Sequence, residues 1–198
     1  MIADERMMTF IHSFDSGNPP YLHELEKYAK ETNVPIVRPQ MQSLLKFLLT
    51  WGRPMKILEV GTAIGFSALL MSEYAPQGCH ITTIEKYEKR IPLAKENFKK
   101  AGKEDKITLL EGDAVEILAD MQETFDFIFM DPPYGKDYEY DVLLALSHSD
   151  IVDRYTIIVI EEALNVPLDY IDECGFETVK VKNYKTNKHI FIRLKESE

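Results

Sequence analysis

Residues 56–65 read KILEVGTAIG, and this stretch decides the fold class of the chain. Its first five residues have the apolar content of a buried strand, and a turn with glycines at Gly61 and Gly65 follows at once. The residues from there to Tyr74 have the length and apolar content of a helix. A strand, a glycine turn and a helix in this order form the ligand-binding end of open α/β sheets.

The same alternation of short apolar strands and helices continues to the end of the chain. We expect strands at 56–60, 80–84, 107–110, 125–130, 156–160, 176–183 and 189–194. We expect helices at 21–31, 39–50, 65–74, 88–101, 114–121, 137–147 and 166–173. Strands that alternate with helices predict a parallel sheet covered on both faces. The last two strands have only residues 184–188 between them, too few for a parallel crossover of about a dozen residues, so they should form an antiparallel hairpin.

The predicted fold is therefore α/β and Rossmann-like, a doubly wound and mostly parallel seven-stranded sheet with an antiparallel C-terminal hairpin and N-terminal helices. The length of 198 residues fits a single domain. Within residues 1–198 we expect a helical extension over 1–52 and, over 53–198, the core that carries the chemistry.

Composition limits the classes of function. No apolar run approaches the roughly 18 residues of a membrane span, and the acidic start of the chain is unlike a signal peptide. Cys79 and Cys174 lie far apart, which gives no sign of a disulfide framework and makes a reducing, cytoplasmic compartment the expectation. The net charge of −10 does not attract nucleic acid through the overall field. Any such binding would need a local basic face, for which the final hairpin offers Lys180, Lys182, Lys185, Lys188 and His189 beside Tyr184.

Candidate ligand-binding residues stand at the ends of successive predicted strands. Acidic Glu59 before the GxxxG turn suits a cofactor with a cationic amino-acid end rather than a pyrophosphate. Glu85, about 20 residues beyond the turn, has the position of an acid that binds a ribose diol. Gly112-Asp113-Ala114 follows the third strand, where Asp113 could accept a hydrogen bond from an adenine amine; it could also cap the next helix, and the two roles do not exclude each other.

The fourth candidate is the loop Asp131-Pro132-Pro133-Tyr134-Gly135 after the strand FDFIFM. Two prolines make the loop stiff and remove two backbone donors, while their carbonyls remain acceptors. A planar amine could donate to Asp131 and the Pro132 carbonyl while its ring stacks on Tyr134. The alternative is a rigid turn without a ligand.

These four sites in this order resemble class I S-adenosylmethionine-dependent methyltransferases, over residues 35–194. From residues 34–36 through 57–68 to Glu85-Lys86, the chain is similar to the catechol-type O-methyltransferase family, most of all to its bacterial branch that methylates 5-hydroxyuridine in tRNA. From Phe125 onward it looks more like the small rRNA guanine-N2 methyltransferases, which carry DPPY and a closing hairpin.

The resemblance implies S-adenosylmethionine as the cofactor and a role for each matching position. The implied cofactor-binding residues are Glu59, Gly61, Thr62, Gly65, Ser67, Glu85, Lys86, Gly112, Asp113, Ala114 and Asp131. The implied acceptor-binding and catalytic residues are Asp131, Pro132, Pro133 and Tyr134.

One departure from the catechol-type pattern concerns its divalent metal. That family holds the metal with an Asp at position 131 and an Asp-Asn pair after the next strand, where this chain has Glu161-Glu162. Magnesium requires near-ideal octahedral geometry, which two longer carboxylates would disturb. We therefore expect no metal, and Asp131, Glu161 and Glu162 as the ligands if there is one.

Taken together, the sequence predicts a methyltransferase that acts on a base of tRNA or rRNA, with an exocyclic amine as the favoured acceptor. The alternatives are a metal-dependent O-methyltransferase of a hydroxylated nucleoside or a small catechol-like molecule, and a non-catalytic cofactor-binding module on the same fold. A membrane partner is not expected. Whether the N-terminal helices pack on the sheet or on a second copy of the chain, in a homodimer, stays open.

Overall fold

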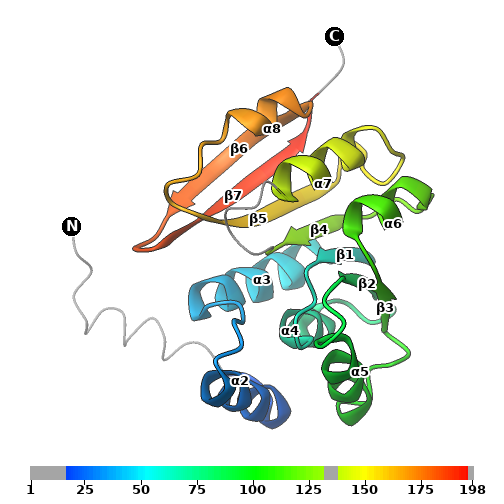
Figure 1. Cartoon of the computed structure of the whole chain (residues 1–198), viewed down its shortest axis with the longest axis vertical. Helices are drawn as coiled ribbons and strands as arrows, with labels where there is room; N and C mark the ends of the chain where they lie inside the picture. The colour runs from blue at the N-terminus through cyan, green and yellow to red at the C-terminus, as the bar shows by residue number, and fades with distance from the viewer. Residues whose placement is uncertain (1–16, 132–137, 196–198) are drawn as a thin grey trace.

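The structure, a computed structural model, describes residues 17–131 and 138–195 and arranges their strands in one sheet (Figure 1). The strand order is β3-β2-β1-β4-β5-β7-β6. The strands are β1 (Lys56–Val60), β2 (His80–Glu85), β3 (Ile107–Glu111), β4 (Phe127–Met130), β5 (Ile157–Ala163), β6 (Phe176–Asn183) and β7 (Asn187–Leu194). The pairs among β1 to β5 are parallel, and β7 is antiparallel to both β5 and β6. The predicted fold class is thus confirmed.

The hairpin strands do not follow the chain order in the sheet. The second strand of the hairpin, β7, lies between β5 and the first strand, β6. β7 pairs with β5 on one side and with β6 on the other. Burial explains this order: β7 is buried along most of its length, whereas β6 is exposed beyond its first two residues. The more apolar strand takes the inner position, and β6 forms the edge.

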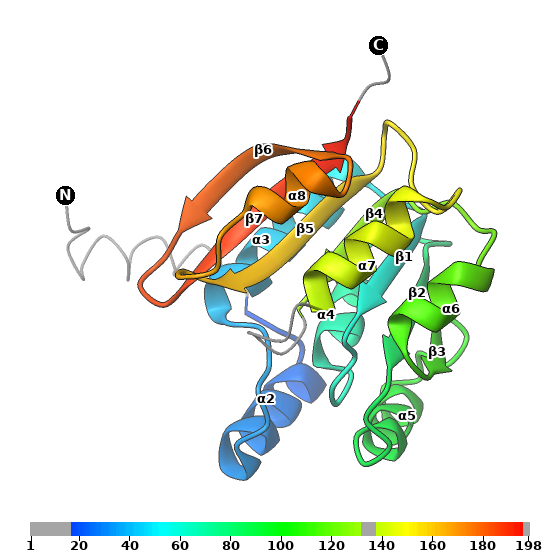
Figure 2. The ribbon, with the colours of Figure 1, turned by 45° about the horizontal axis from the view of Figure 1, so that its top comes forward.

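Helices cover both faces of the sheet (Figure 2). One layer holds α2 (Pro20–Thr32), α3 (Pro39–Gly52), α4 (Phe66–Tyr74) and α5 (Ile91–Lys100), whose buried side chains join one apolar cluster. The other layer holds α6 (Ala114–Asp120), α7 (Tyr138–Ser147) and α8 (Asp169–Glu173), which join a second cluster. Alternate residues of each strand enter the two clusters, as Phe129 and Met130 of β4 do.

The N-terminal helices α2 and α3 pack in the first apolar cluster. Leu22 of α2 and both Met41 and Leu45 of α3 are fully buried in the first cluster with the side chains of α4. Among the residues that the structure describes, no helix has the length and apolarity that crossing a membrane requires.

Several expected boundaries were wrong by a few residues, and one matters for function. β5 continues to Ala163, so Glu161 and Glu162 lie inside a strand and not in the loop after it. Their backbones pair with His189 and Lys188 of β7, which also begins earlier than expected, at Asn187. Pairing with each other therefore extends β5 and β7 into polar segments, which the sequence pattern did not identify as strand.

Candidate active site

The glycine turn joins β1 to α4 through three residues with positive φ. Gly61, Ala63 and Gly65 have φ of 101°, 48° and 84°. The N–H groups of Gly61 and Thr62 donate to the carbonyl of Ile84 at 3.0 and 3.2 Å, which ties the turn to the end of β2. A Cβ at Gly65 would lie 2.5 Å from Cε1 of Phe98, so this glycine is required by packing on α5 as well as by its backbone.

A chain of buried polar side chains lies beneath the turn. The hydroxyls of Thr62 and Thr83 are 2.6 Å apart, and Thr83 donates to Oε2 of Glu59. Glu59 is fully buried in β1, and Oε1 has no hydrogen-bond partner among the described residues. Burial raises the pKa of Glu59 to about 7, although the nearby hydroxyls of Ser67 and Thr83 act in the opposite direction. Glu59 is therefore a buried acid at the floor of the turn for which the described residues provide no ion-pair partner.

A cavity of about 640 Å³ opens at the carboxyl ends of β1, β2 and β3. It brings together six of the predicted cofactor-binding residues: Gly61, Glu85, Lys86, Gly112, Asp113 and Ala114. Tyr138 and Val142 of α7 also line it, and no sequence motif marked them. Cavities of this size and place in an α/β sheet are typical binding sites for small ligands.

Glu85 does more than line this cavity. Its Oε2 accepts the N–H of Ala63 and its Oε1 accepts the N–H of Tyr87, both at 2.7 Å. The carboxylate thus holds the strained turn residue Ala63 in place. Each oxygen keeps a further lone pair, so Glu85 could still accept from the hydroxyls of a ribose.

Asp113 caps α6, as one of the two interpretations of the sequence expected. Its Oδ1 accepts the N–H of Val115 at 2.9 Å, and its Oδ2 pairs with Nζ of Lys86 at 2.7 Å. The Lys86 contact and the cap lower the pKa of Asp113, so the side chain is ionised at the cavity wall. The cap uses only Oδ1 of Asp113. The contact of Asp113 with an adenine amine stays a prediction.

Asp131 follows β4, next to the cavity. Its N–H donates to the carbonyl of Val60, a cavity-lining residue, at 3.4 Å. Burial raises the pKa of Asp131 well above its ordinary value; the carboxylates of Glu161 and Glu59 raise it further, whereas the guanidinium of Arg38 lowers it. The other predicted acceptor-binding residues, Pro132, Pro133 and Tyr134, lie outside the described residues.

The end of the hairpin differs from the basic rim that the sequence predicted. His189 is fully buried against the ring of Tyr184, with centroids 4.3 Å apart, and burial lowers its pKa to about 4. Lys188 is also buried, and its Nζ donates to the carbonyl of Val166. These two residues were wrongly assigned to an exposed basic surface, because strand pairing turns them inward; Lys180, Lys182 and Lys185 remain exposed.

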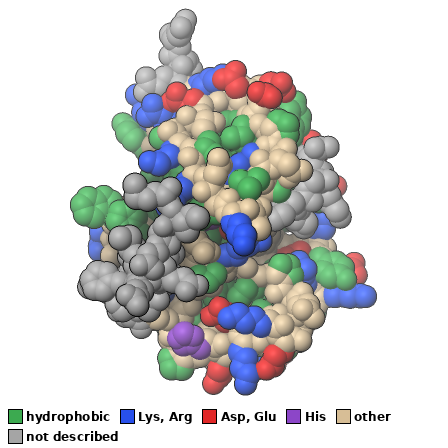
Figure 3. All heavy atoms as spheres, turned by 90° about the vertical axis from the view of Figure 1, so that its left-hand side faces the viewer, with side chains coloured by type: hydrophobic (Ala, Val, Ile, Leu, Met, Phe, Trp, Pro, Cys, Tyr) green, Lys and Arg blue, Asp and Glu red, His purple; other side chains and the backbone are tan. Residues whose placement is uncertain are grey.

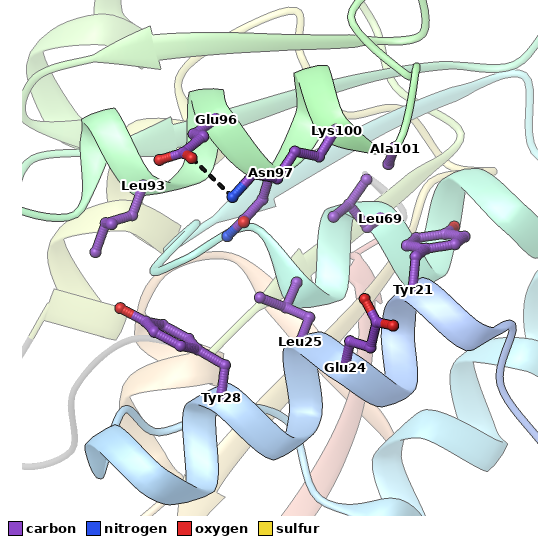
Figure 4. Close-up of a pocket in the computed structure, with 10 residues that line it drawn as sticks. All are labelled: Tyr21, Glu24, Leu25, Tyr28, Leu69, Leu93, Glu96, Asn97, Lys100 and Ala101. Carbon is purple, nitrogen blue, oxygen red and sulfur yellow. Dashed lines mark ion pairs between the residues drawn. The ribbon is translucent and has the colours of Figure 1, made fainter.

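A second hollow, of about 280 Å³, lies between α2, α4 and α5 (Figure 4). Tyr21, Leu25 and Tyr28 of α2 face Leu69 of α4 and the α5 side chains across it. It shares no lining residue with the larger cavity and contains none of the predicted site residues. The larger cavity is therefore the candidate site.

Comparison with known proteins agrees with this geometry. A sequence model of the O-methyltransferase family matches residues 12–173. The chain belongs to the O-methyltransferase family. The predicted membership of the methyltransferases is thereby confirmed. The matching family is the O-methyltransferase family, which the first part of the sequence resembled.

Individual relatives are distant. A catechol O-methyltransferase of Niastella koreensis is 29% identical over 116 residues, 55% of this chain and 52% of that protein. A tRNA1(Val) (adenine(37)-N6)-methyltransferase of Histophilus somni is 31% identical over 80 residues, 40% of this chain and 34% of that protein. The chain thus spans about half, or less, of the length of these relatives. An SAH-bound methyltransferase of Podospora anserina is similar in structure, with a TM-score of 0.78 at 21% identity over 97% of this chain and 95% of that one.

Proposed function

We propose that this protein is an S-adenosylmethionine-dependent methyltransferase that transfers the methyl group to a hydroxyl of a small acceptor. The observation that carries the proposal is the cavity of about 640 Å³ at the strand ends, where Gly61, Glu85 and Asp113 meet. Asp131 stands at the neighbouring strand end, beside the place where an acceptor could meet the cofactor. The family match over residues 12–173 supports the hydroxyl as the acceptor group.

The residues present fit the cofactor chemically. Glu85 offers free lone pairs to ribose hydroxyls, and Asp113 offers its ionised carboxylate beside Ala114 for an adenine amine. The buried Glu59, whose Oε1 has no hydrogen-bond partner among the described residues, suits the cationic end of a sulfonium amino acid. When bound, S-adenosylmethionine supplies a methyl group that its sulfonium already activates, so the protein mainly has to align the acceptor.

A hydroxyl acceptor must lose its proton, and Asp131 is the candidate base. A carboxylate whose pKa is raised by burial and by neighbouring carboxylates is a stronger base near neutral pH than an exposed one. An Oδ atom of Asp131 would take the hydroxyl proton as the oxygen gains the methyl group. The proton would then pass to solvent when the product leaves.

A second candidate function is methylation of an exocyclic amine in an RNA base. It is favoured by the sequence Asp131-Pro132-Pro133-Tyr134 and by the partial similarity to the adenine-N6 methyltransferase of Histophilus somni. The exposed lysines of the hairpin, Lys180, Lys182 and Lys185, could contact phosphates. An amine needs no base before it attacks, so Asp131 would then only orient the acceptor.

Two measurements test the proposal. Calorimetry with S-adenosylhomocysteine should show binding that Gly61→Val abolishes, since the added side chain would enter the cavity at a residue with φ of 101°. Transfer of tritiated methyl groups to small catechols and to bulk tRNA then separates the acceptors. Label in the catechols supports O-methylation, label in tRNA supports the second function, and a folded protein that binds no S-adenosylhomocysteine contradicts both.

A further inference from the structure

The divalent metal that the resemblance to catechol-type enzymes implies does not fit the residues that the structure describes at this site. Glu161 and Glu162 are consecutive residues of β5, and side chains of consecutive strand residues point to opposite faces of a sheet. Glu161 shares its face with His189, whose Nε2 lies 4.0 Å from Oε2 of Glu161. Glu162 lies on the face of α8, where burial and then the Glu162 carboxylate raise the pKa of Tyr170. Glu162 therefore cannot join Asp131 and Glu161 around one ion.

Glu161, the other carboxylate on the Asp131 side of the sheet, already accepts a hydrogen bond. Nδ2 of Asn187 donates to Oε1 of Glu161 at 2.5 Å, so this amide presents its donor and not its oxygen. Among the described residues, no group of three or more His, Cys, Asp or Glu side chains could hold a metal ion. Strand alternation thus separates Glu162 from Asp131 and Glu161, the other two metal ligands that the resemblance implied.

Arg38 brings a positive charge to the face of the sheet that carries Asp131 and Glu161. It precedes Pro39, the first residue of α3, and its extended backbone (φ −70°, ψ 159°) is the conformation that a following proline favours. Its guanidinium donates to the hydroxyl of Thr186 in the turn between β6 and β7. Thr186 directly precedes Asn187, which donates to Glu161, so this hydrogen bond holds Arg38 near the carboxylates on the Asp131 face of the sheet.

The surroundings of Arg38 form one side of an open surface. Lys182 of β6 places Nζ 5.1 Å from the centre of the Tyr184 ring, and both lie at the same hairpin end as Thr186. Figure 3 views the side of the molecule where α3 and the ends of β6 and β7 lie, and shows Lys and Arg side chains around a hollow. A guanidinium has five donors in a fixed fork, and one bond to Thr186 leaves donors for a ligand.

We propose that Arg38 takes the place of a metal at the acceptor end of the site, where its guanidinium binds a carboxylate group of the acceptor. This inference rests on the proposed function and specifies its substrate class: a small hydroxylated aromatic acid rather than a neutral catechol. The guanidinium fork matches a carboxylate with two parallel hydrogen bonds, which fixes the orientation of the acceptor. The hydroxyl to be methylated would then point towards Asp131.

The first experiment tests the absence of a metal site. Mn²⁺ is titrated into the S-adenosylhomocysteine complex, and the electron paramagnetic resonance signal of the free ion is recorded, with Asp131→Asn as the comparison. We expect the same signal for both proteins and for buffer alone. Stoichiometric loss of the free-ion signal in the wild type, restored in Asp131→Asn, would overturn the inference.

The second experiment tests the acceptor class. Affinities of 3,4-dihydroxybenzoate and catechol for the S-adenosylhomocysteine complex are measured by calorimetry in the wild type, Arg38→Gln and Arg38→Lys. The control is Arg53→Gln, an exposed arginine at the other end of α3. We expect the wild type and Arg53→Gln to bind the acid roughly tenfold or more tightly than catechol, the effect of hydrogen bonds to a charged group. Arg38→Gln should lose this preference, and Arg38→Lys should retain part of it.

The outcomes separate this inference from the proposed function. S-adenosylhomocysteine should bind all four proteins equally, since Arg38 does not line the cofactor cavity. If the cofactor binds but the wild type does not prefer the acid, or binds neither compound, Arg38 has no such role while the methyltransferase assignment stands. If the cofactor itself does not bind, the proposed function fails first. Melting temperatures check that Arg38→Gln remains folded.

Discussion

Substitution of Gly65 by alanine should destabilise the protein far more than a usual glycine replacement. The backbone has φ of 84°, and the new Cβ would lie 2.5 Å from Cε1 and 2.9 Å from Cζ of Phe98. A left-handed backbone costs an L-residue about 1–2 kcal/mol, and overpacking a core costs about 1–3 kcal/mol. Phe98 is 3% exposed and cannot turn away freely. The sum predicts a loss of about 2–5 kcal/mol in the free energy of unfolding.

Gly102 provides the matched control. It follows α5 with φ of 61°, and an added Cβ meets nothing within 4 Å. Gly102→Ala therefore carries only the backbone term, about 1–2 kcal/mol. Urea unfolding followed by circular dichroism gives both free energies, and the difference between them measures the contact with Phe98. Equal losses in the two variants would refute the packing argument.

A third variant separates packing from cofactor binding. Phe98→Leu removes the ring that the Cβ would meet, so Gly65→Ala should cost less in that background, as a double-mutant cycle would show. Gly65 is not among the residues that line the cofactor cavity. Gly65→Ala protein that is still folded should accordingly bind S-adenosylhomocysteine better than Gly61→Val does.

Three further predictions follow from the site. Glu85→Ala should lose about 1.5–3 kcal/mol of S-adenosylhomocysteine binding, the range for hydrogen bonds to a charged group; a loss within calorimetric error would make Glu85 only a support of the turn. The raised pKa of Glu59, about 7 against 4.5, means that its stabilising contribution is complete below pH 4.5 and lost as the pH rises towards 7, so Glu59→Gln should flatten the pH dependence of urea unfolding there; an unchanged slope would contradict the buried acid. The lowered pKa of His189, about 4 against 6.5, affects stability in the opposite direction: the contribution of His189 to the free energy of unfolding is present above pH 6.5 and lost as the pH falls towards 4. His189→Phe should therefore lose less stability over this acid range, as urea unfolding at each pH would show.

The fold could be predicted because each level of the sequence pointed to the same answer. The strand 56–60 and the glycine turn were located correctly, since apolar runs and glycines are local signals. The order of the hairpin strands could not be predicted, because it depends on which strand finds more apolar partners. Asn187 and Lys188 read as part of a polar turn, yet both are buried in the ladder with β5.

Some residues of the candidate site could likewise be located from the sequence, and others could not. Residues at strand ends, such as Glu85 and Asp113, could be located from the sequence because parallel strands bring their carboxyl ends to one edge. Arg38 could not, since it reaches the hairpin turn from 148 residues away through a tertiary contact. Thr83 was missed as well, because a threonine within an apolar strand gives no sign that its hydroxyl bonds Glu59.

The contrast between Glu161 and Glu162 shows how the extension of a strand by a few residue pairs changes the chemistry available to a site. In a loop, two consecutive acids could turn towards the same ion; in a strand, the pleat sends them apart. Their separation leaves Glu161 on the same face as Asp131 and Glu59, where burial and the carboxylates of Glu161 and Glu59 raise the pKa of Asp131. Such a cluster is costly unless cations meet it. The sulfonium cofactor at one end and Arg38 at the other would supply that charge, which is why we expect the site to assemble fully only when cofactor and acceptor are both bound.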